Sequence, residues 1–330
     1  MHSTGRSAAF WLAHYGGSAI IPLSVASRPL LESGWPGSGG SFLRQRGAIT
    51  VARESMDLRD ALSVETARAP RRLKVTRADL QQTIPGILPG WNFGLDDPTC
   101  ADIDVAGLHQ ACLRAFKRDG GALLRLAGLK RAHRGDARWH IDAGTESFTA
   151  DVIVDAAGAW ADDVALKCGV QPLRIRPYRR TIVQLRMGRS GLRDLPLVID
   201  ALGRFYFKGE GDNRLWVSPH DETATEPCDA APNEIDVATA IDHLQSIVDW
   251  PIEAVERKWA GLRSFTPSRV PAYGFDPDAQ GFFWCAGQGG FGIQTAPAAS
   301  AVAAALLLDA EPEAFVSHID PAMFAPRRAP

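Results

Sequence analysis

Residues 282–295 read FFWCAGQGGFGIQT, and this stretch decides the fold more than any other. Its first five residues are apolar, which predicts a short buried strand that runs into a cluster of glycines. The alanine-rich residues 296–308 predict a helix behind the glycines, with Thr295 as its N-cap and Pro297 in its first turn. A strand that meets a helix through glycines is typical of a nucleotide-binding α/β domain.

The glycines of residues 287–292 let the backbone lie flat against a planar or phosphate-bearing ligand. The start of the following helix adds partial positive charge, which would favour the electron-rich edge of a reduced flavin. A tight strand-to-helix turn without any ligand explains the same glycines. Taken alone, the cluster fits that second interpretation slightly better.

A second small-residue stretch lies at residues 152–160, which read VIVDAAGAW. The apolar start predicts a strand, and Ala156 to Ala159 leave room for something to approach the backbone closely. A cofactor could fill that room, and close packing of a helix on the strand is an equally good explanation.

The bulk composition limits the classes of protein. The chain has 330 residues, of which 45% are hydrophobic and 22% charged, so two soluble domains are expected. A net charge of −2 argues against a nucleic-acid or anionic-membrane partner. No apolar run is long enough for a transmembrane segment and the start does not resemble a signal peptide, so the expected location is the cytoplasm. The five cysteines lie far apart, without metal-ligand spacing, which predicts free thiols and no bound metal.

Several further elements are expected from periodicity and turn residues. A helix with a Gly16-Gly17 break is predicted over residues 7–31, and another from Asp102 or Asp104 to residue 118. The remaining predictions are partial helix over residues 57–82, strands at 47–52, 123–129, 139–141 and 148–154, a hairpin within 205–217, and a helix over 234–249. Together they predict an α/β nucleotide-binding domain interrupted by a mostly β second domain.

Two arginines and two tyrosines are candidates for holding a substrate. Arg180 and Arg263 lie beside aromatic and apolar residues, and an arginine fork suits a bidentate grip on a carboxylate. Tyr15 and Tyr206 could close a site and donate a hydrogen bond. For each arginine alone a surface or ion-pair role is the commoner explanation, and for each tyrosine packing is.

Taken together, these stretches resemble the D-amino-acid oxidase and glycine oxidase superfamily of FAD-dependent enzymes, and within it the D-arginine dehydrogenase-like bacterial oxidoreductases. The resemblance covers nearly the whole chain in order. It rests on HSTGRSAA (2–9), YG (15–16), ADID (101–104), LHQ (108–110), AAGAW (156–160), RRT (179–181), WAGLRSF (259–265), QGGFGIQT (288–295) and PRR (326–328).

The resemblance implies an FAD-binding Rossmann-like domain with an inserted, mostly β (α+β) substrate domain. The expected division assigns residues 1–40, 101–170 and 256–330 to the FAD-binding domain and residues 41–100 and 171–255 to the substrate domain. It also implies that Arg180 and Arg263 hold the substrate carboxylate together with Tyr206, that Tyr15 belongs to a closing lid, and that Gln294 adjoins flavin and substrate. The implied FAD contacts are Ser3, Gly5, Arg6, Ser7, Ala8, Ala9, Leu129, Ala157, Gly158, Trp160, Gly289, Gly290, Phe291, Gly292, Ile293 and Thr295, with Leu129 at the adenine end.

The sequence departs from the family pattern in two places. The family begins with a strand, a GxGxxG turn and a helix that hold the ADP half of FAD, and this sequence starts just after that unit. We therefore expect roughly 30–40 residues, on the order of one βαβ unit, to be missing through a late start codon or fragmentation. The second departure is in the site, where Phe10 and Ala48 stand in place of a histidine and an acidic residue of the arginine-specific relative.

These departures predict a neutral or apolar D-amino acid as substrate, because Phe10 and Ala48 cannot neutralise a cationic side chain. The expected reaction is hydride transfer from Cα to FAD, giving an imine that hydrolyses to a 2-oxo acid. Two alternatives stay open: a remnant that no longer binds FAD, and a flavin amine oxidase for sarcosine, glycine or an opine. The sequence leaves the electron acceptor, oxygen or a quinone, undecided.

Overall fold

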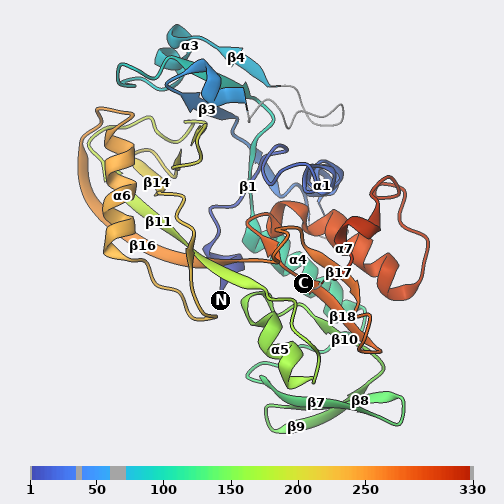
Figure 1. Cartoon of the computed structure of the whole chain (residues 1–330). Coiled ribbons are helices and arrows are strands. Elements are labelled where there is room, and N and C mark those ends of the chain that lie inside the picture. The colour runs from blue at the N-terminus through green and yellow to red at the C-terminus, as the bar shows by residue number, and fades with distance from the viewer. Residues whose placement is uncertain (1, 35–38, 60–71, 328–330) are drawn as a thin grey trace.

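The structure is a computed structural model of the chain, and it describes residues 2–34, 39–59 and 72–327 (Figure 1). A ten-stranded sheet forms one part of the molecule, and three smaller sheets with their helices form the rest. The large sheet is antiparallel except where β12 runs parallel to β3. Its strands, in spatial order, are β19 (Gln288–Gly289), β16 (Ile252–Phe265), β11 (Arg176–Met187), β14 (Arg214–Ser218), β13 (Tyr206–Gly209), β12 (Leu197–Asp200), β3 (Ala48–Ala52), β5 (Phe93–Asp97) and β4 (Leu73–Val75), with β15 (Thr223–Ala224) beside β11.

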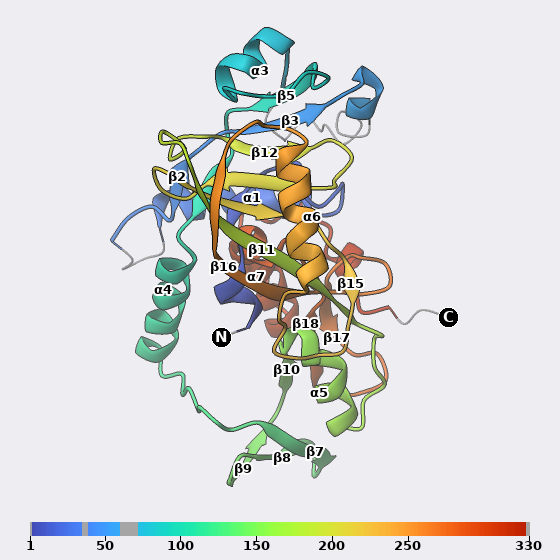
Figure 2. The same cartoon turned by 90° about the vertical axis from the view of Figure 1, so that its left-hand side faces the viewer.

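One face of the large sheet is covered by helix α6 (Glu234–Gln245), as Figure 2 shows. The Asn233 side chain caps this helix by accepting from the Ile235 N–H. Leu244 of α6 and Leu80 of the short helix α3 (Arg77–Thr83) are buried in the same core. The opposite face of the sheet is therefore the one left to build a site.

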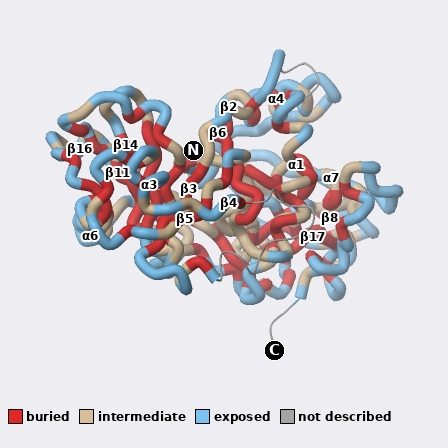
Figure 3. The backbone as a smooth tube through the Cα atoms, turned by 90° about the horizontal axis from the view of Figure 1, so that it is seen from above, coloured by how far each residue is buried: buried red, intermediate tan, exposed pale blue. Residues whose placement is uncertain are grey.

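A second core lies around a three-stranded sheet of β10 (Ile153–Asp155), β18 (Phe282–Ala286) and β17 (Ala272–Phe275). β10 and β18 are parallel, as the central strands of nucleotide-binding domains are. Helix α7 (Gly292–Leu308) packs on helix α1 (Ile21–Ser33) through small residues such as Ala298 and Ala299. Figure 3 shows buried stretches both in the large sheet and around α1 and α7.

The remaining elements connect these two parts. β1 (Phe10–Trp11), β6 (Ala101–Ile103) and β2 (Leu43–Gln45) form one small sheet, and α4 (Val105–Arg118) follows β6. β7 (Leu129–Gly135), β8 (Arg138–Ala143) and β9 (Glu146–Ala150) form a meander. Single helical turns are η1 (Ser3–Arg6), η2 (Ser55–Leu58), η3 (Gly158–Trp160) and η4 (Pro321–Phe324), and α5 (Ala161–Lys167) follows η3. In the part of the chain that is described, no helix is long and apolar enough to cross a membrane.

The predicted mixed α/β fold class is confirmed. The strand at 48–52, the capped helix after Asp104, the hairpin of β13 and β14, and the strand at 282–286 all form as predicted. The helix predicted over 234–249 forms as α6 but ends at Gln245. Of the partial helix predicted over 57–82, residues 60–71 lie outside the described residues.

Three local predictions are wrong. Residues 7–20 form β1 and turns instead of helix, because Ala9, Gly16 and Gly17 have positive φ. Residues 123–128 form no strand and leave Leu126 fully exposed. Helix α7 begins at Gly292, so Thr295 is not its N-cap but lies inside its first turn.

The division into two domains stays a prediction. β2, in a segment assigned to the substrate domain, pairs with β6 of the other. β16 runs unbroken from residue 252 to residue 265, across the expected boundary at 256. At its end β16 pairs with β19, and it therefore joins the large sheet to the glycine-rich segment.

Candidate active site

Arg180 and Arg263 lie on the same face of the large sheet. They come from the neighbouring antiparallel strands β11 and β16, where Tyr178 pairs with Arg263 and Arg180 with Gly261. Because side chains alternate between the two faces of a strand, residues two apart share one face. Arg180 is almost fully buried, and burial together with the nearby Arg263 lowers the pKa of its guanidinium. Arg180 pairs with Glu222 at 3.3 Å and lies 4.0 Å from Asp221, so the positive charge of the two arginines is only partly compensated by the protein.

Tyr15 and Gly290 surround the guanidinium of Arg263. The Tyr15 hydroxyl accepts a hydrogen bond of 2.6 Å from Arg263 Nη1. A Cβ at Gly290 would lie 3.0 Å from Arg263 Nη1 and 3.2 Å from the Tyr15 hydroxyl. The glycine therefore lets the arginine and the glycine-rich segment approach one another closely, since a Cβ here would press on both groups.

Tyr206 and Arg180 each present an unused polar atom. The Tyr206 hydroxyl and Arg180 Nη1 are buried, and neither has a hydrogen-bond partner among the described residues. Burial raises the pKa of Tyr206, so the phenol keeps its proton at neutral pH. A buried donor without a partner is costly, and a ligand carboxylate would satisfy both groups.

A small cavity of about 20 Å³, with room for about one water molecule, lies beside Tyr15, Arg263 and Gly290, and neither Arg180 nor Tyr206 is among its lining residues. Aromatic rings crowd it: Tyr15 lies 5.7 Å from Phe10 and 5.2 Å from Phe291, measured between ring centroids. A ring-sized ligand therefore requires Tyr15 or its neighbours to move. The cavity is lined by Ser7, Ala8, Ala9, Phe10, Tyr15, Arg263, Gly290, Ile293 and Gln294.

Gln294 has a role that the sequence did not predict. Its amide Oε1 accepts from the Leu12 N–H at 3.2 Å, and its Nε2 donates to the Tyr15 carbonyl and to Ser24 Oγ at 3.2 and 2.7 Å. Gln294 lines the cavity, but its polar atoms hold the segment that carries Tyr15. The predicted contact with flavin and substrate stays a prediction.

The amino-terminal segment lies across β16. Ser3 Oγ donates to the Leu262 carbonyl at 2.7 Å, and Trp259 Nε1 donates to the Arg6 carbonyl at 3.0 Å. Arg6 itself donates to the carbonyls of Ala230 and Ala260 and forms an ion pair with Asp229. Of the predicted FAD contacts, Ser3, Gly5 and Arg6 lie in the turn η1 that contacts β16, and Ser7, Ala8 and Ala9 line the small cavity, but the Arg6 guanidinium already has protein partners.

The other predicted FAD contacts lie in several places. At the end of β10, Ala157 precedes Gly158, which has a φ of +62° and open space where a Cβ would point. Trp160 lies 4.7 Å from the ring of His2. Leu129 is in the β7–β8–β9 meander, at the end of the molecule away from β3 and β4 (Figure 1).

The last group of predicted FAD contacts lies in the glycine-rich turn and the first turn of α7. Phe291 is the N-cap of α7 and gives no side-chain cap, so the N–H groups of the first turn remain available. Thr295 Oγ instead donates back to the Phe291 carbonyl at 2.9 Å. Gly289, Gly292 and Ile293 lie in the same turn. An uncapped terminus of a seventeen-residue helix, beside glycines, fits the electron-rich edge of a flavin ring.

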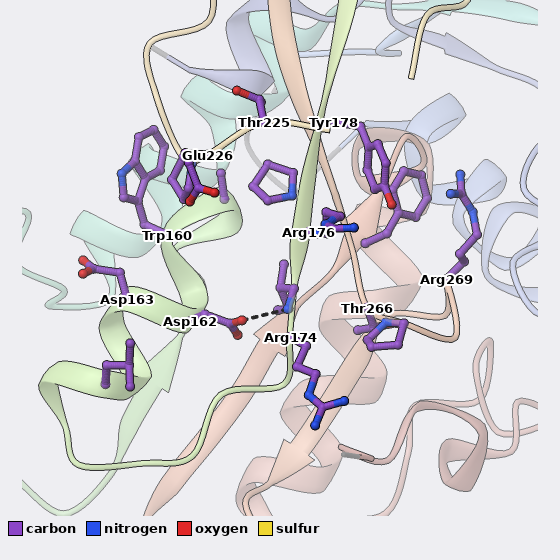
Figure 4. A pocket seen from close by; sticks show the side chains of 17 residues that line it. Trp160, Asp162, Asp163, Arg174, Arg176, Tyr178, Thr225, Glu226, Thr266 and Arg269 are labelled. Carbon is purple, nitrogen blue, oxygen red and sulfur yellow. Dashed lines mark hydrogen bonds between the residues drawn. The ribbon is translucent and has the colours of Figure 1, made fainter. Parts of the chain in front are cut away.

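A larger cavity lies elsewhere, between α5 and the start of β11, with a volume of about 1010 Å³ (Figure 4). Trp160 is the predicted site residue that lines it, together with Tyr178, Phe265 and Arg269. The ring of Phe265 lies 6.0 Å from that of Phe291, so this cavity adjoins the glycine-rich turn. Arg269 was not predicted from the sequence, because its contact with Glu222 joins segments 47 positions apart in the chain.

A parallel strand–glycine–helix unit beside a sheet with paired arginines defines a class of oxidoreductases that bind a nucleotide cofactor. A model of the family described as "FAD dependent oxidoreductase" (DAO) matches residues 1–306. The chain belongs to the DAO family of FAD-dependent oxidoreductases, and its cofactor is FAD. The resemblance to D-arginine dehydrogenase-like members stays a prediction.

Among curated proteins, the uncharacterized oxidoreductase YurR of Bacillus subtilis (strain 168) is 24% identical over 300 residues, which cover 87% of this chain and 78% of YurR. Glycine oxidase of Pseudomonas aeruginosa is 26% identical over 265 residues, covering 80% of this chain and 60% of that enzyme. FAD-dependent oxidoreductase domain-containing protein 1 of Xenopus laevis is 26% identical over 186 residues, covering 50% of this chain and 36% of that protein.

Among solved structures, glycine oxidase from Geobacillus kaustophilus has a TM-score of 0.82 at 20% identity, covering 99% of this chain and 89% of that one. L-proline dehydrogenase from P. horikoshii has a TM-score of 0.82 at 18% identity, covering 98% and 88%. At this level of identity the likeness shows the fold.

Proposed function

We propose that the protein oxidises the Cα–N bond of a neutral or apolar D-amino acid. The observation that carries this proposal is the buried face beside the guanidinium of Arg263, where Arg180 Nη1 and the Tyr206 hydroxyl have no hydrogen-bond partner among the described residues. Three convergent donors match the two oxygens of one carboxylate. Holding the carboxylate there would fix the direction of the Cα–H bond.

The residues that would hold FAD are the glycine-rich turn, the start of α7 and the Ser7–Ala9 backbone, which line or adjoin the small cavity. The chemistry that bound FAD would supply there is the acceptance of a hydride from Cα. The chain itself positions the amino acid and excludes water from it. Tyr15 would perform that exclusion, since its ring closes the cavity against Phe10 and Phe291. The released imine hydrolyses to a 2-oxo acid.

The preference for a neutral or apolar side chain rests on what surrounds Tyr206. Phe10 and Ala48 belong to one apolar cluster with Tyr206, and Ala48 is buried. Lys208, two residues along β13 from Tyr206, is also buried and pairs with Asp102 at 2.9 Å. A cationic side chain would meet an apolar wall and an ammonium group, and it would find no free carboxylate at those positions.

Glycine or a simple amine is a second candidate substrate, because glycine oxidases are among the similar curated proteins and solved structures. If glycine were the substrate, it would have no side chain to contact the apolar cluster around Phe10. Preference for glycine or sarcosine over every D-amino acid would favour this candidate.

The test begins with the absorbance spectrum of the purified protein, which should show bound flavin. Anaerobic flavin reduction is then followed with D-leucine, D-methionine, D-arginine, D-lysine, glycine and sarcosine. We expect D-leucine or D-methionine to reduce the flavin fastest. Faster reduction by D-arginine or D-lysine would refute the proposed preference, and a colourless protein that binds no added FAD would support an inactive remnant.

The role of the arginine pair is tested separately by Arg263→Ala. This variant should lose most of its catalytic efficiency, by a factor of at least 100, because a charge-assisted contact to the carboxylate is removed. Arg257→Ala is the matched control, since Arg257 is an exposed arginine on the same strand. Unchanged kinetics in Arg263→Ala would remove Arg263 from the site.

A further inference from the structure

Glu222 lies between an arginine of the candidate site and an arginine of the large cavity. Its Oε1 accepts from Arg180 Nη2 at 3.3 Å and from Arg269 Nη2 at 2.9 Å, and its Oε2 accepts from Arg269 at 3.1 Å. The guanidinium of Arg269 is held from the other side by Phe265, with its carbon 3.9 Å from the ring centroid. Figure 4 shows Arg269 beside Tyr178 in the large cavity. The carboxylate of Glu222 therefore binds one arginine of the candidate site and one arginine of the large cavity.

Further ion pairs extend this network. Arg179 Nη2 lies 2.8 Å from Asp236, and Asp221 lies 3.9 Å from Arg179 Nε and 4.0 Å from Arg180 Nε. The carboxylate of Asp221 also accepts from the backbone and hydroxyl of Thr181. Asp221 is thus committed to holding β11 in place, whereas Glu222 has no such backbone bond among the described residues.

The charges of this network nearly cancel. Burial and the two arginines of the site lower the pKa of His220 to about 3, so this neighbour is neutral. Four guanidinium groups then face three carboxylates, which leaves a single positive charge. The groups are Arg179, Arg180, Arg263 and Arg269 against Asp221, Glu222 and Asp236.

We propose that Glu222 is a specificity-determining residue that restricts the arginine site to ligands with one carboxylate. The single net positive charge attracts a monocarboxylate and is neutralised by it. A dicarboxylate brings two negative charges, so its binding leaves the site with a net negative charge. A second ligand carboxylate near Arg180 would also meet the carboxylate of Glu222 itself. This inference rests on the proposed function, in which Arg180 and Arg263 bind the substrate carboxylate.

The size of the effect follows from the position of Glu222, whose side chain is 37% exposed. Solvent screens a charge at such a site, so removing it changes the affinity for one ligand charge by about threefold. A dicarboxylate carries twice the charge and should respond by about tenfold. Glu222→Gln removes the charge and keeps an acceptor oxygen for Arg180 and Arg269.

The experiment measures binding of propionate and malonate by titration calorimetry, since these two probes differ by one carboxylate. In Glu222→Gln we expect propionate to bind about threefold tighter and malonate about tenfold tighter than in the unmodified protein. Both gains should shrink in 1 M salt. Loss of a merely structural contact would weaken both ligands. An unchanged ratio of the two affinities would overturn the proposal.

Two further variants keep the result interpretable. Arg269→Gln removes one positive charge, so it should weaken propionate about threefold, opposite in sign to Glu222→Gln. Glu234→Gln is the matched control, because Glu234 pairs with Lys258 and with no arginine of the network in the described residues, so both affinities should stay unchanged. If Arg263→Ala binds propionate as well as the unmodified protein, the proposed function fails. If only the Glu222 and Arg269 variants show no effect, this inference alone fails.

Discussion

The hydrogen bond between Tyr15 and Arg263 joins residues 248 positions apart and can be measured directly. Tyr15→Phe removes the hydroxyl while keeping the ring contacts with Phe10 and Phe291. Among the described residues, the Arg263 guanidinium makes no hydrogen bond other than this one. We therefore expect the interaction of these two side chains to contribute measurably to the stability of the protein.

The magnitude follows from the chemistry of the pair. A hydrogen bond to a charged group contributes about 1.5–3 kcal/mol, and the lower end applies here because Arg263 is only partly buried by the protein. Arg263→Met on its own is a poor measure, because it also removes the repulsion between Arg263 and Arg180. A double-mutant cycle separates the two contributions.

The assay is urea unfolding of four proteins: the unmodified chain, Tyr15→Phe, Arg263→Met and the double variant. We expect a coupling free energy of about 1.5 kcal/mol without ligand. Saturating propionate should reduce this coupling, because the carboxylate gives Arg263 another partner. A coupling below about 0.5 kcal/mol, or one that propionate leaves unchanged, would refute the geometry described for Tyr15.

Two other substitutions test single features. Gly290→Ala should weaken propionate binding by at least about tenfold with an unchanged circular dichroism spectrum, since the added Cβ would lie 3.0 Å from Arg263 Nη1. Binding as tight as in the unmodified protein would contradict this. Burial raises the pKa of Asp155 to about 7, well above its unfolded value, so the free energy of unfolding should fall by up to about 4 kcal/mol as the pH rises from about 4 to about 7. Asp155→Asn should lack this slope in urea unfolding at each pH, and an identical slope would show that other groups cause it.

Local sequence predicted those elements whose own residues decide their structure. The helix after Asp104 has its cap and its stripe of apolar residues within fifteen positions, so the sequence sufficed. Residues 7–20 looked helical because they are small and apolar. Their structure is set instead by distant partners, above all the amide of Gln294 that bonds Leu12 and Tyr15.

The same reasoning explains which site residues the sequence revealed. Arg180 and Arg263 were predicted from their motifs, and the antiparallel register of β11 and β16 places them on one face. Glu222 and Arg269 were missed, because a lone acid in a loop and a lone arginine in a turn carry no local pattern. The large sheet brings them together, and periodicity along the chain does not encode that contact.

The amino-terminal segment has a consequence for how the protein folds. Ser3 and Arg6 bond to β16 across 259 and 254 positions of the chain, and Tyr15 meets Arg263 across 248. Contacts of such long sequence separation form late, because the loop they close is almost the whole polypeptide. A nascent chain released before residue 263 would have no arginine pair. Under the proposed function, propionate binding would therefore report that synthesis and folding of the chain are complete, which helix content alone would not show.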